Sequence, residues 1–138
     1  MIVVDTNVVS ELVKPDRSWR VVDWFDRNIR EIALATPSIA ELQIGVMAMA
    51  DGRRRAEIGA AYMDIFDLLA ERILTFDRAA AKAFADIAIA CRRRGKPINT
   101  IDCQIAAIAQ THRASIATRD TDFAATGAKL INPWDYDP

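Results

Sequence analysis

The chain opens with the stretch Ile2-Val3-Val4-Asp5-Thr6-Asn7, in which three apolar β-branched residues are followed at once by polar ones. A short apolar run that ends in turn-forming residues is typical of a buried β-strand. The stretch therefore predicts a strand over residues 2–4 with an acid, Asp5, directly at its end.

The same pattern recurs along the chain, and longer stretches with apolar residues at helical spacing separate the short runs. Gly95-Lys96-Pro97 ends one of these helical stretches. Strands that alternate with helices favour an α/β fold with a mainly parallel sheet and helices on both faces. We predict five strands at residues 2–4, 32–35, 73–75, 115–118 and 129–131, and helices at 18–29, 38–50, 54–70, 78–94 and 100–112.

Length and composition fit one domain over residues 1–138, with 51% hydrophobic and 27% charged residues. A net charge of -1 excludes a generally basic surface for nucleic acid, so such contacts must come from local patches. No run approaches the roughly 18 apolar residues of a membrane span, and Asp5 interrupts any signal-peptide core. We expect a cytoplasmic protein without membrane contact. Cys91 and Cys103 lack metal-ligand spacing and are interpreted as small buried hydrophobic residues.

Four acids fall near predicted strand ends or helix starts. Asp5 and Asp120 follow the first and fourth strands, Glu41 lies in the first turn of a helix opening at Ser38, and Asp102 lies in the first turn of the helix opening near residue 99. Function in open parallel sheets gathers at the carboxyl ends of the strands. The topology therefore predicts that Asp5, Glu41 and Asp120 share one edge, which Asp102 can join from its helix start.

Each acid also has a purely structural interpretation. Ser38-x-x-Glu41 is a capping-box pattern, and Asp5 and Asp120 fit helix N-caps. Asp102 suits the positive end of a helix dipole. Asp77, which also follows a strand, is interpreted as a cap alone.

Their combination favours a metal site. Two carboxylates 4 Å apart repel by about 4 kcal/mol at an effective dielectric of 20, so a group of four needs protons or a cation. Oxygen ligands without Cys or His suit Mg²⁺ or Mn²⁺. Such a site activates water for attack on phosphorus, as in phosphodiester hydrolysis.

Four blocks resemble the PIN-domain nucleases, specifically the VapC toxins of type II toxin–antitoxin pairs and their FitB-like branch. The blocks are Ile2-Val3-Val4-Asp5-Thr6-Asn7-Val8-Val9-Ser10-Glu11, Pro37-Ser38-Ile39-Ala40-Glu41-Leu42-Gln43-Ile44-Gly45-Val46, Ile101-Asp102-Cys103-Gln104-Ile105-Ala106-Ala107 and Ala117-Thr118-Arg119-Asp120-Thr121-Asp122-Phe123. The closing Ile131-Asn132-Pro133-Trp134 also looks like the end of that branch. The resemblance spans the whole chain in the right order and implies a PIN-like three-layer fold.

The resemblance implies that Asp5, Glu41, Asp102 and Asp120 are catalytic metal ligands, with Asp122 replacing or assisting Asp120. It implies supporting roles for Asn7 and Thr118, which would orient the acids or the attacking water. It further implies RNA cleavage with Mg²⁺ or Mn²⁺, a homodimer, a cognate antitoxin partner, and contact with DNA only through that antitoxin.

Basic and aromatic residues remain open to two interpretations. Arg92 and Arg93 could grip phosphate or only complement a helix C-terminus, and Arg119 could contact RNA or pair with an acid. Trp19, Trp24 and Phe25 crowd one early helix and are interpreted as packing, although an exposed member would favour a groove for an antitoxin helix.

Two other classes of function stay in competition. An aspartate-based phosphoryl-transfer domain would use Asp5 as acceptor, yet the second aspartate of a DxD phosphatase is missing. A non-catalytic partner that regulates DNA through its antitoxin would be expected to have lost one of the four acids.

Overall fold

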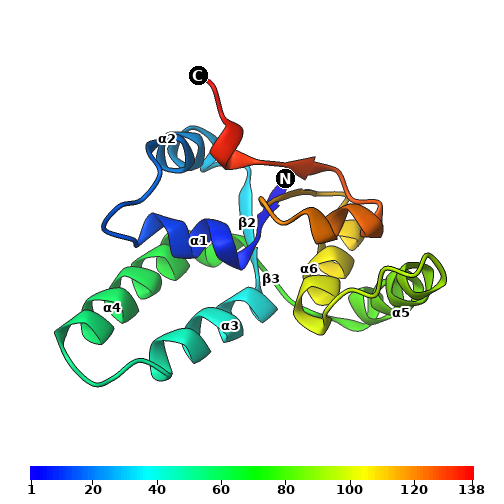
Figure 1. The fold of residues 1–138 in the computed structure, drawn as a ribbon, viewed down its shortest axis with the longest axis horizontal. Helices are drawn as coiled ribbons and strands as arrows, with labels where there is room; N and C mark the ends of the chain where they lie inside the picture. The colour runs from blue at the N-terminus through cyan, green and yellow to red at the C-terminus, as the bar shows by residue number, and fades with distance from the viewer.

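The computed structural model describes residues 1–138 and alternates strands with helices (Figure 1). The strands are β1 Ile2–Val4, β2 Ile32–Ala35, β3 Ile73–Leu74, β4 Ser115–Ala117 and β5 Leu130–Ile131. The α-helices are α1 Thr6–Leu12, α2 Trp19–Asn28, α3 Thr36–Met47, α4 Arg53–Leu68, α5 Arg78–Arg93 and α6 Thr100–Thr111. Short 3₁₀ helices are η1 Ala70–Arg72, η2 Thr121–Thr126 and η3 Pro133–Asp135.

All five strands pair in parallel, in the order β3-β2-β1-β4-β5. The first strand of the chain is therefore the central one, and its Val3 lies between Ala33 and Ile116. Parallel pairing aligns the carboxyl ends of the strands at one edge, where Asp5 follows β1. The predicted α/β fold with about five short strands is confirmed.

Helices cover both faces of the sheet, which gives three layers (Figure 1). Because side chains alternate along a strand, Val3 packs with α5 and α6 while Val4 packs with α1, α2, α3 and α4. Trp24 and Phe25 are buried in the second of these clusters, as expected, whereas Trp19 is 60% exposed. Cys91 and Cys103 are buried and free, as predicted.

Two helices differ from the prediction. The sequence analysis assigned no helix to Thr6–Leu12, because seven residues rich in β-branched and polar side chains have little helix propensity of their own. Burial of Val8 and Val9 against the sheet stabilises this helix. The helix predicted at 38–50 begins instead at Thr36, with Pro37 in its first turn, where proline is well tolerated. None of the helices is long and apolar enough to span a lipid bilayer.

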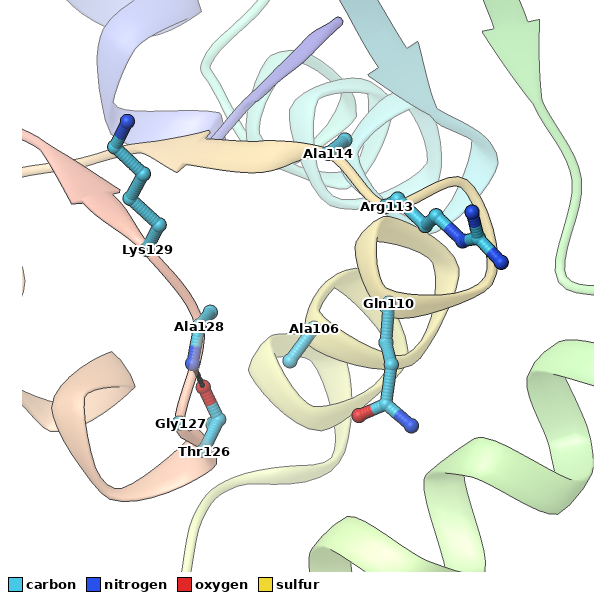
Figure 2. A pocket seen from close by; sticks show the side chains of 8 residues that line it. All are labelled: Ala106, Gln110, Arg113, Ala114, Thr126, Gly127, Ala128 and Lys129. Atoms are coloured by element: carbon cyan, nitrogen blue, oxygen red, sulfur yellow. Dashed lines mark hydrogen bonds between the residues drawn. The ribbon is translucent and has the colours of Figure 1, made fainter.

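A hollow of about 210 Å³ lies between α6 and the turn before β5 (Figure 2). Ala114 and Lys129, which directly precede β4 and β5, place it at the amino ends of the strands. Its two basic side chains, Arg113 and Lys129, point away from one another (Figure 2). The hollow therefore gathers no convergent polar groups, and it lies at the opposite end of the strands from Asp5.

Candidate active site

Asp5 lies at the end of the central strand, where its backbone N–H donates to Ala117 O at 2.9 Å. Its side chain is buried, with the residue only 3% exposed. The Thr118 hydroxyl donates to Asp5 Oδ2 at 2.8 Å, and Asn7 Nδ2 donates to the same oxygen at 3.3 Å. The two predicted supporting residues thus fix one carboxylate oxygen, Oδ2.

The environment of Asp5 disfavours its charge. Burial raises the pKa of Asp5, and hydrogen bonds from Thr118 and from the Thr6 backbone only partly oppose that effect. The negative charges of Glu41 and Asp120 raise this pKa further. A cation beside these groups would relieve both the burial cost and the repulsion.

Asp102 occupies the first turn of α6 and is 9% exposed. Asn99, the N-cap residue, accepts from the Asp102 amide at 2.9 Å and donates to Asp102 Oδ2 at 2.6 Å. Burial raises the pKa of Asp102 to about 6, and the charges of Asp5, Asp120 and Glu41 contribute, although the Asn99 hydrogen bond opposes them. The capping role considered for this acid is therefore real, but it leaves Asp102 in an acidic neighbourhood.

Asp120 lies in the turn after β4 and is half-buried. Its amide donates to the Thr118 hydroxyl at 2.9 Å, and its Oδ1 accepts from the Asp122 amide at 2.9 Å, so it caps η2. Asp122 is exposed, and its charge is absent from the influences that raise the pKa values of Asp5 and Asp102. Of these two acids, Asp120 is the one whose charge raises the pKa values of Asp5 and Asp102.

Glu41 is exposed on α3 and accepts no hydrogen bond. The capping-box interpretation is wrong: the N-cap residue is Ala35, no side chain caps the helix, and Ser38 lies inside the helix. The buried Ser38 Oγ and Thr6 Oγ1 have no hydrogen-bond partner. By contrast, Asp77 is the cap that the sequence predicts, since it accepts from the Ala80 amide at 2.9 Å.

The structure brings the four predicted acids within electrostatic reach of one another, because the charges of the other three raise the pKa of Asp102. Nowhere in the chain do three acidic, His or Cys side chains stand as close as ligands of one ion. The four carboxylates therefore influence one another's charge but do not form a closed set of ligands in this structure. An all-oxygen donor set of mutually repelling acids nevertheless fits a hard divalent cation, and the exposed Glu41 has the freedom to approach one.

The predicted basic residues lie outside this group. Arg92 and Arg93 are exposed in the last turn of α5 and contact none of the acids. Arg119 is exposed and stacks on Trp134. A groove of about 470 Å³, lined by Lys96 and Asp122 among others, runs between η2 and the turn after α5.

Asn99 is the site residue that the sequence analysis missed, although that analysis places the start of the helix correctly near residue 99. The signal was present, because Asn99-x-x-Asp102 has the spacing of a reciprocal N-cap. Asn99 holds one oxygen of Asp102 much as Thr118 holds one oxygen of Asp5.

Fold and site together define a parallel α/β domain with a cluster of carboxylates at the carboxyl edge of its sheet. Residues 2–129 match the PIN domain family, to which the chain belongs. The chain is 40% identical to VapC ribonuclease Y4jK of Sinorhizobium fredii, over 98% of this chain and 99% of that protein. It is 39% identical to toxin FitB of Neisseria gonorrhoeae, over 97% of this chain and 99% of that one.

A solved structure of FitAB bound to an IR36 DNA fragment contains the same fold. The match has a TM-score of 0.91 at 35% identity and covers 100% of this chain and 99% of that one. The PIN-like three-layer fold expected from the resemblance is thereby confirmed.

Proposed function

We propose that this chain is a metal-dependent endoribonuclease that acts as the toxin of a toxin–antitoxin pair. One observation carries the proposal: Asp5, Glu41, Asp102 and Asp120 come from four separate segments, yet the charges of this group raise the pKa values of the buried Asp5 and Asp102. A stability-driven fold has no reason to gather uncompensated acids. Such an arrangement is typical of a cation site.

We propose Mg²⁺ or Mn²⁺ as the cation, with Asp5 and Asp102 as its firmest ligands and Glu41 and Asp120 completing the set. Bound there, it would lower the pKa of a coordinated water and stabilise negative charge on a phosphodiester oxygen. Asp122 remains a candidate to assist Asp120 through water.

The chain's own residues orient the acids. Thr118 and Asn7 hold Asp5 Oδ2, and Asn99 holds Asp102 Oδ2, so both carboxylates are fixed in orientation. The Thr118 hydroxyl both donates to Asp5 and accepts from the Asp120 amide, which links two of the acids. Preorganised ligands bind a cation with less ordering cost than mobile ones.

RNA as the substrate rests on the relatives, one of which is named a ribonuclease. The groove beside Asp122 offers a path for a strand, with Lys96 at its wall. Arg92 and Arg93 remain proposed phosphate contacts, supported by their exposure and charge. The net charge of -1 is consistent with contacts confined to such local patches.

A cognate antitoxin is the proposed inhibitor, with DNA contacted only through it. Support comes from the likeness to toxin FitB and to the FitAB structure that holds DNA.

We further propose a homodimer. The side chains of Ile44 and Met47 on α3 and Met63 on α4 are exposed apolar groups of the kind that subunits bury. Sedimentation of the isolated chain tests this proposal, and a monomer at micromolar concentration would contradict it.

Cleavage of structured RNAs by the purified chain tests the activity. We expect fragments with Mg²⁺ or Mn²⁺, none with EDTA, and a loss of at least about a hundredfold in Asp5→Asn and Asp102→Asn, since each removes a ligand charge. Asp77→Asn is the matched control, because Asp77 follows a strand but only caps α5.

Cleavage that persists equally in EDTA, or in both site variants, would contradict the proposal. The same samples separate the competing classes. A phosphorylated Asp5 after exposure to acyl phosphate would favour the phosphoryl-transfer domain. Antitoxin-dependent DNA binding without any RNA cleavage would favour the non-catalytic partner.

A further inference from the structure

Arg119 stands directly before Asp120 and is held by an aromatic ring. Its guanidinium carbon lies 4.6 Å from the centroid of the Trp134 ring. That distance is within the range of a cation–π contact, in which a planar guanidinium stacks on an aromatic face. Arg119 is therefore not a free surface cation, although its side chain is exposed to solvent.

Trp134 is itself fixed at the end of the chain. Asn132 caps η3 by accepting from the Trp134 amide at 3.1 Å, and Trp134 packs against the cluster that contains α2. Arg20 Nη1 of α2 donates to Tyr136 O at 2.9 Å. The ring under Arg119 therefore belongs to a segment anchored on both sides.

The charge of Arg119 also acts on a buried acid outside the site. Glu11, at the end of α1, is 6% exposed and takes no part in the group of four acids. Burial alone would raise the pKa of Glu11, but hydrogen bonds from Lys14 and the Ser18 amide, with the charges of Lys14 and Arg119, lower it below 4.5. Arg119 thus helps to neutralise Glu11 without a direct ion pair.

The backbone around Arg119 carries the link between two site acids. Thr118 donates to Asp5 and accepts from the Asp120 amide, and the Asp122 amide donates to Asp120. A side chain fixed at position 119 restricts the peptide units on both sides of it.

We propose that Arg119 is a positioning residue, which holds the segment from Thr118 to Asp122 through its stack on Trp134. Asp120 is thereby kept in the turn that the Thr118 hydroxyl links to Asp5, and the guanidinium is engaged within the protein rather than with a phosphate. The catalytic part of this inference rests on the proposed function; the ordering of the segment does not.

Amide hydrogen exchange in the metal-free chain, without RNA, tests the ordering. We expect the peptide covering residues 118–122 to exchange about two- to fivefold faster in Arg119→Ala and in Trp134→Leu, which matches the loss of one exposed cation–π contact. Trp134→Phe, which keeps an aromatic face, should restore most of the protection. Arg30 is an exposed arginine that makes no hydrogen bond, ion pair or aromatic contact, so Arg30→Ala should leave the exchange unchanged.

Exchange of β1 amides serves as the internal reference, because a variant that merely unfolds would accelerate them too. If the β1 amides stay protected while residues 118–122 exchange at the wild-type rate in both Arg119→Ala and Trp134→Leu, the stack of Arg119 on Trp134 does not order this segment. If Trp134→Leu unfolds globally, Arg119→Lys still tests the proposal, because lysine keeps the charge but loses the flat stack. Exchange as fast as in Arg119→Ala supports the stack, and exchange at the wild-type rate contradicts it.

Kinetics with RNA separate positioning from substrate contact. Positioning predicts that Arg119→Ala lowers kcat with KM and its salt dependence unchanged. A direct phosphate contact would instead raise KM and reduce the slope of log KM against log salt by about one, which would overturn the proposal. A chain without ribonuclease activity would refute the proposed function, while the exchange result would still show whether Arg119 orders residues 118–122.

Discussion

At the scale of single residues, the raised pKa of Asp102 shows most clearly that the group of acids destabilises the metal-free fold. Burial and three neighbouring acids raise its pKa to about 6, although Asn99 donates to it at 2.6 Å. A folded protein that holds a proton more tightly than the unfolded chain is most stable when that proton is bound. The metal-free fold therefore works against the ionised form of Asp102.

We predict that this group makes metal-free stability depend on pH. The pKa of Asp102 rises from 3.8 to about 6 on folding. The contribution of its bound proton to the free energy of unfolding is therefore complete below pH 3.8 and is lost as the pH rises to about 6. Asp102→Asn lacks that loss. Urea unfolding in EDTA from pH 4 to 8 should show wild type losing stability relative to Asp102→Asn up to about pH 6, with a constant difference above it. A constant difference over the whole range would contradict the prediction.

Ser38 offers a second test at this scale, because its hydroxyl is buried without a partner. A buried hydroxyl without a hydrogen bond costs about 1–3 kcal/mol. Ser38→Ala should therefore raise the free energy of unfolding by about 1 kcal/mol, as measured by urea unfolding. Thr118→Val is the contrasting variant, since the Thr118 hydroxyl is fully used and its loss should destabilise the fold. A destabilised Ser38→Ala would reveal a partner that the structure does not contain.

At the scale of secondary-structure elements, α5 and α6 end in the same hydrogen-bonded motif with different residues. Gly95 and Arg113 both have positive φ, 70° and 53°. In each motif the following amide, of Lys96 or Ala114, donates back five residues. Glycine adopts this backbone without strain, whereas arginine does not.

We predict opposite effects of substitution at these two helix ends. Arg113→Gly should raise the free energy of unfolding by about 0.5–1 kcal/mol, and Gly95→Ala should lower it by about 1 kcal/mol. Arg93→Gly, inside the last turn of α5, is the control and should destabilise by about 1 kcal/mol. Chemical denaturation measures all three. Equal effects at Arg113 and Arg93 would show that backbone strain at 113 is absent.

The elements also show what a sequence can reveal. Strands and long helices were predicted within two or three residues, because burial imposes periods of two and about 3.6 on their side chains. The helix Thr6–Leu12 escaped prediction, because its stability comes from packing rather than from its own residues. The start of α3 was misplaced for a similar reason, since Thr36-Pro37 stops a strand and also begins a helix.

For the site, strand ends identified Asp5 and Asp120, and helix starts identified Asp102, from local pattern alone. Their convergence needed the strand order, which no local pattern contains. The partners of Arg119 were equally hidden, because Trp134 and Glu11 are brought to it by the fold rather than by the sequence around it.

At the scale of the whole molecule, the fold spaces four acids that repel one another, so a cation that binds them should stabilise the entire domain. A ligand at a hundred times its dissociation constant adds about 2.7 kcal/mol to the folded state. We predict that Mn²⁺ raises the Tm of wild type and of Asp77→Asn but not of Asp5→Asn or Asp102→Asn. Calorimetry measures this shift, and an equal rise in all four proteins would mean that the ion binds elsewhere.

The central position of β1 also bears on the synthesis of the protein. Asp5 is synthesised 113 residues before Thr118, the residue whose hydroxyl donates to it, and Asp120 follows two residues later. Neither the sheet around β1 nor the group of acids can form until β4 has been made. A nascent chain that has not yet reached β4, or one terminated before it, would thus lack the assembled group of acids.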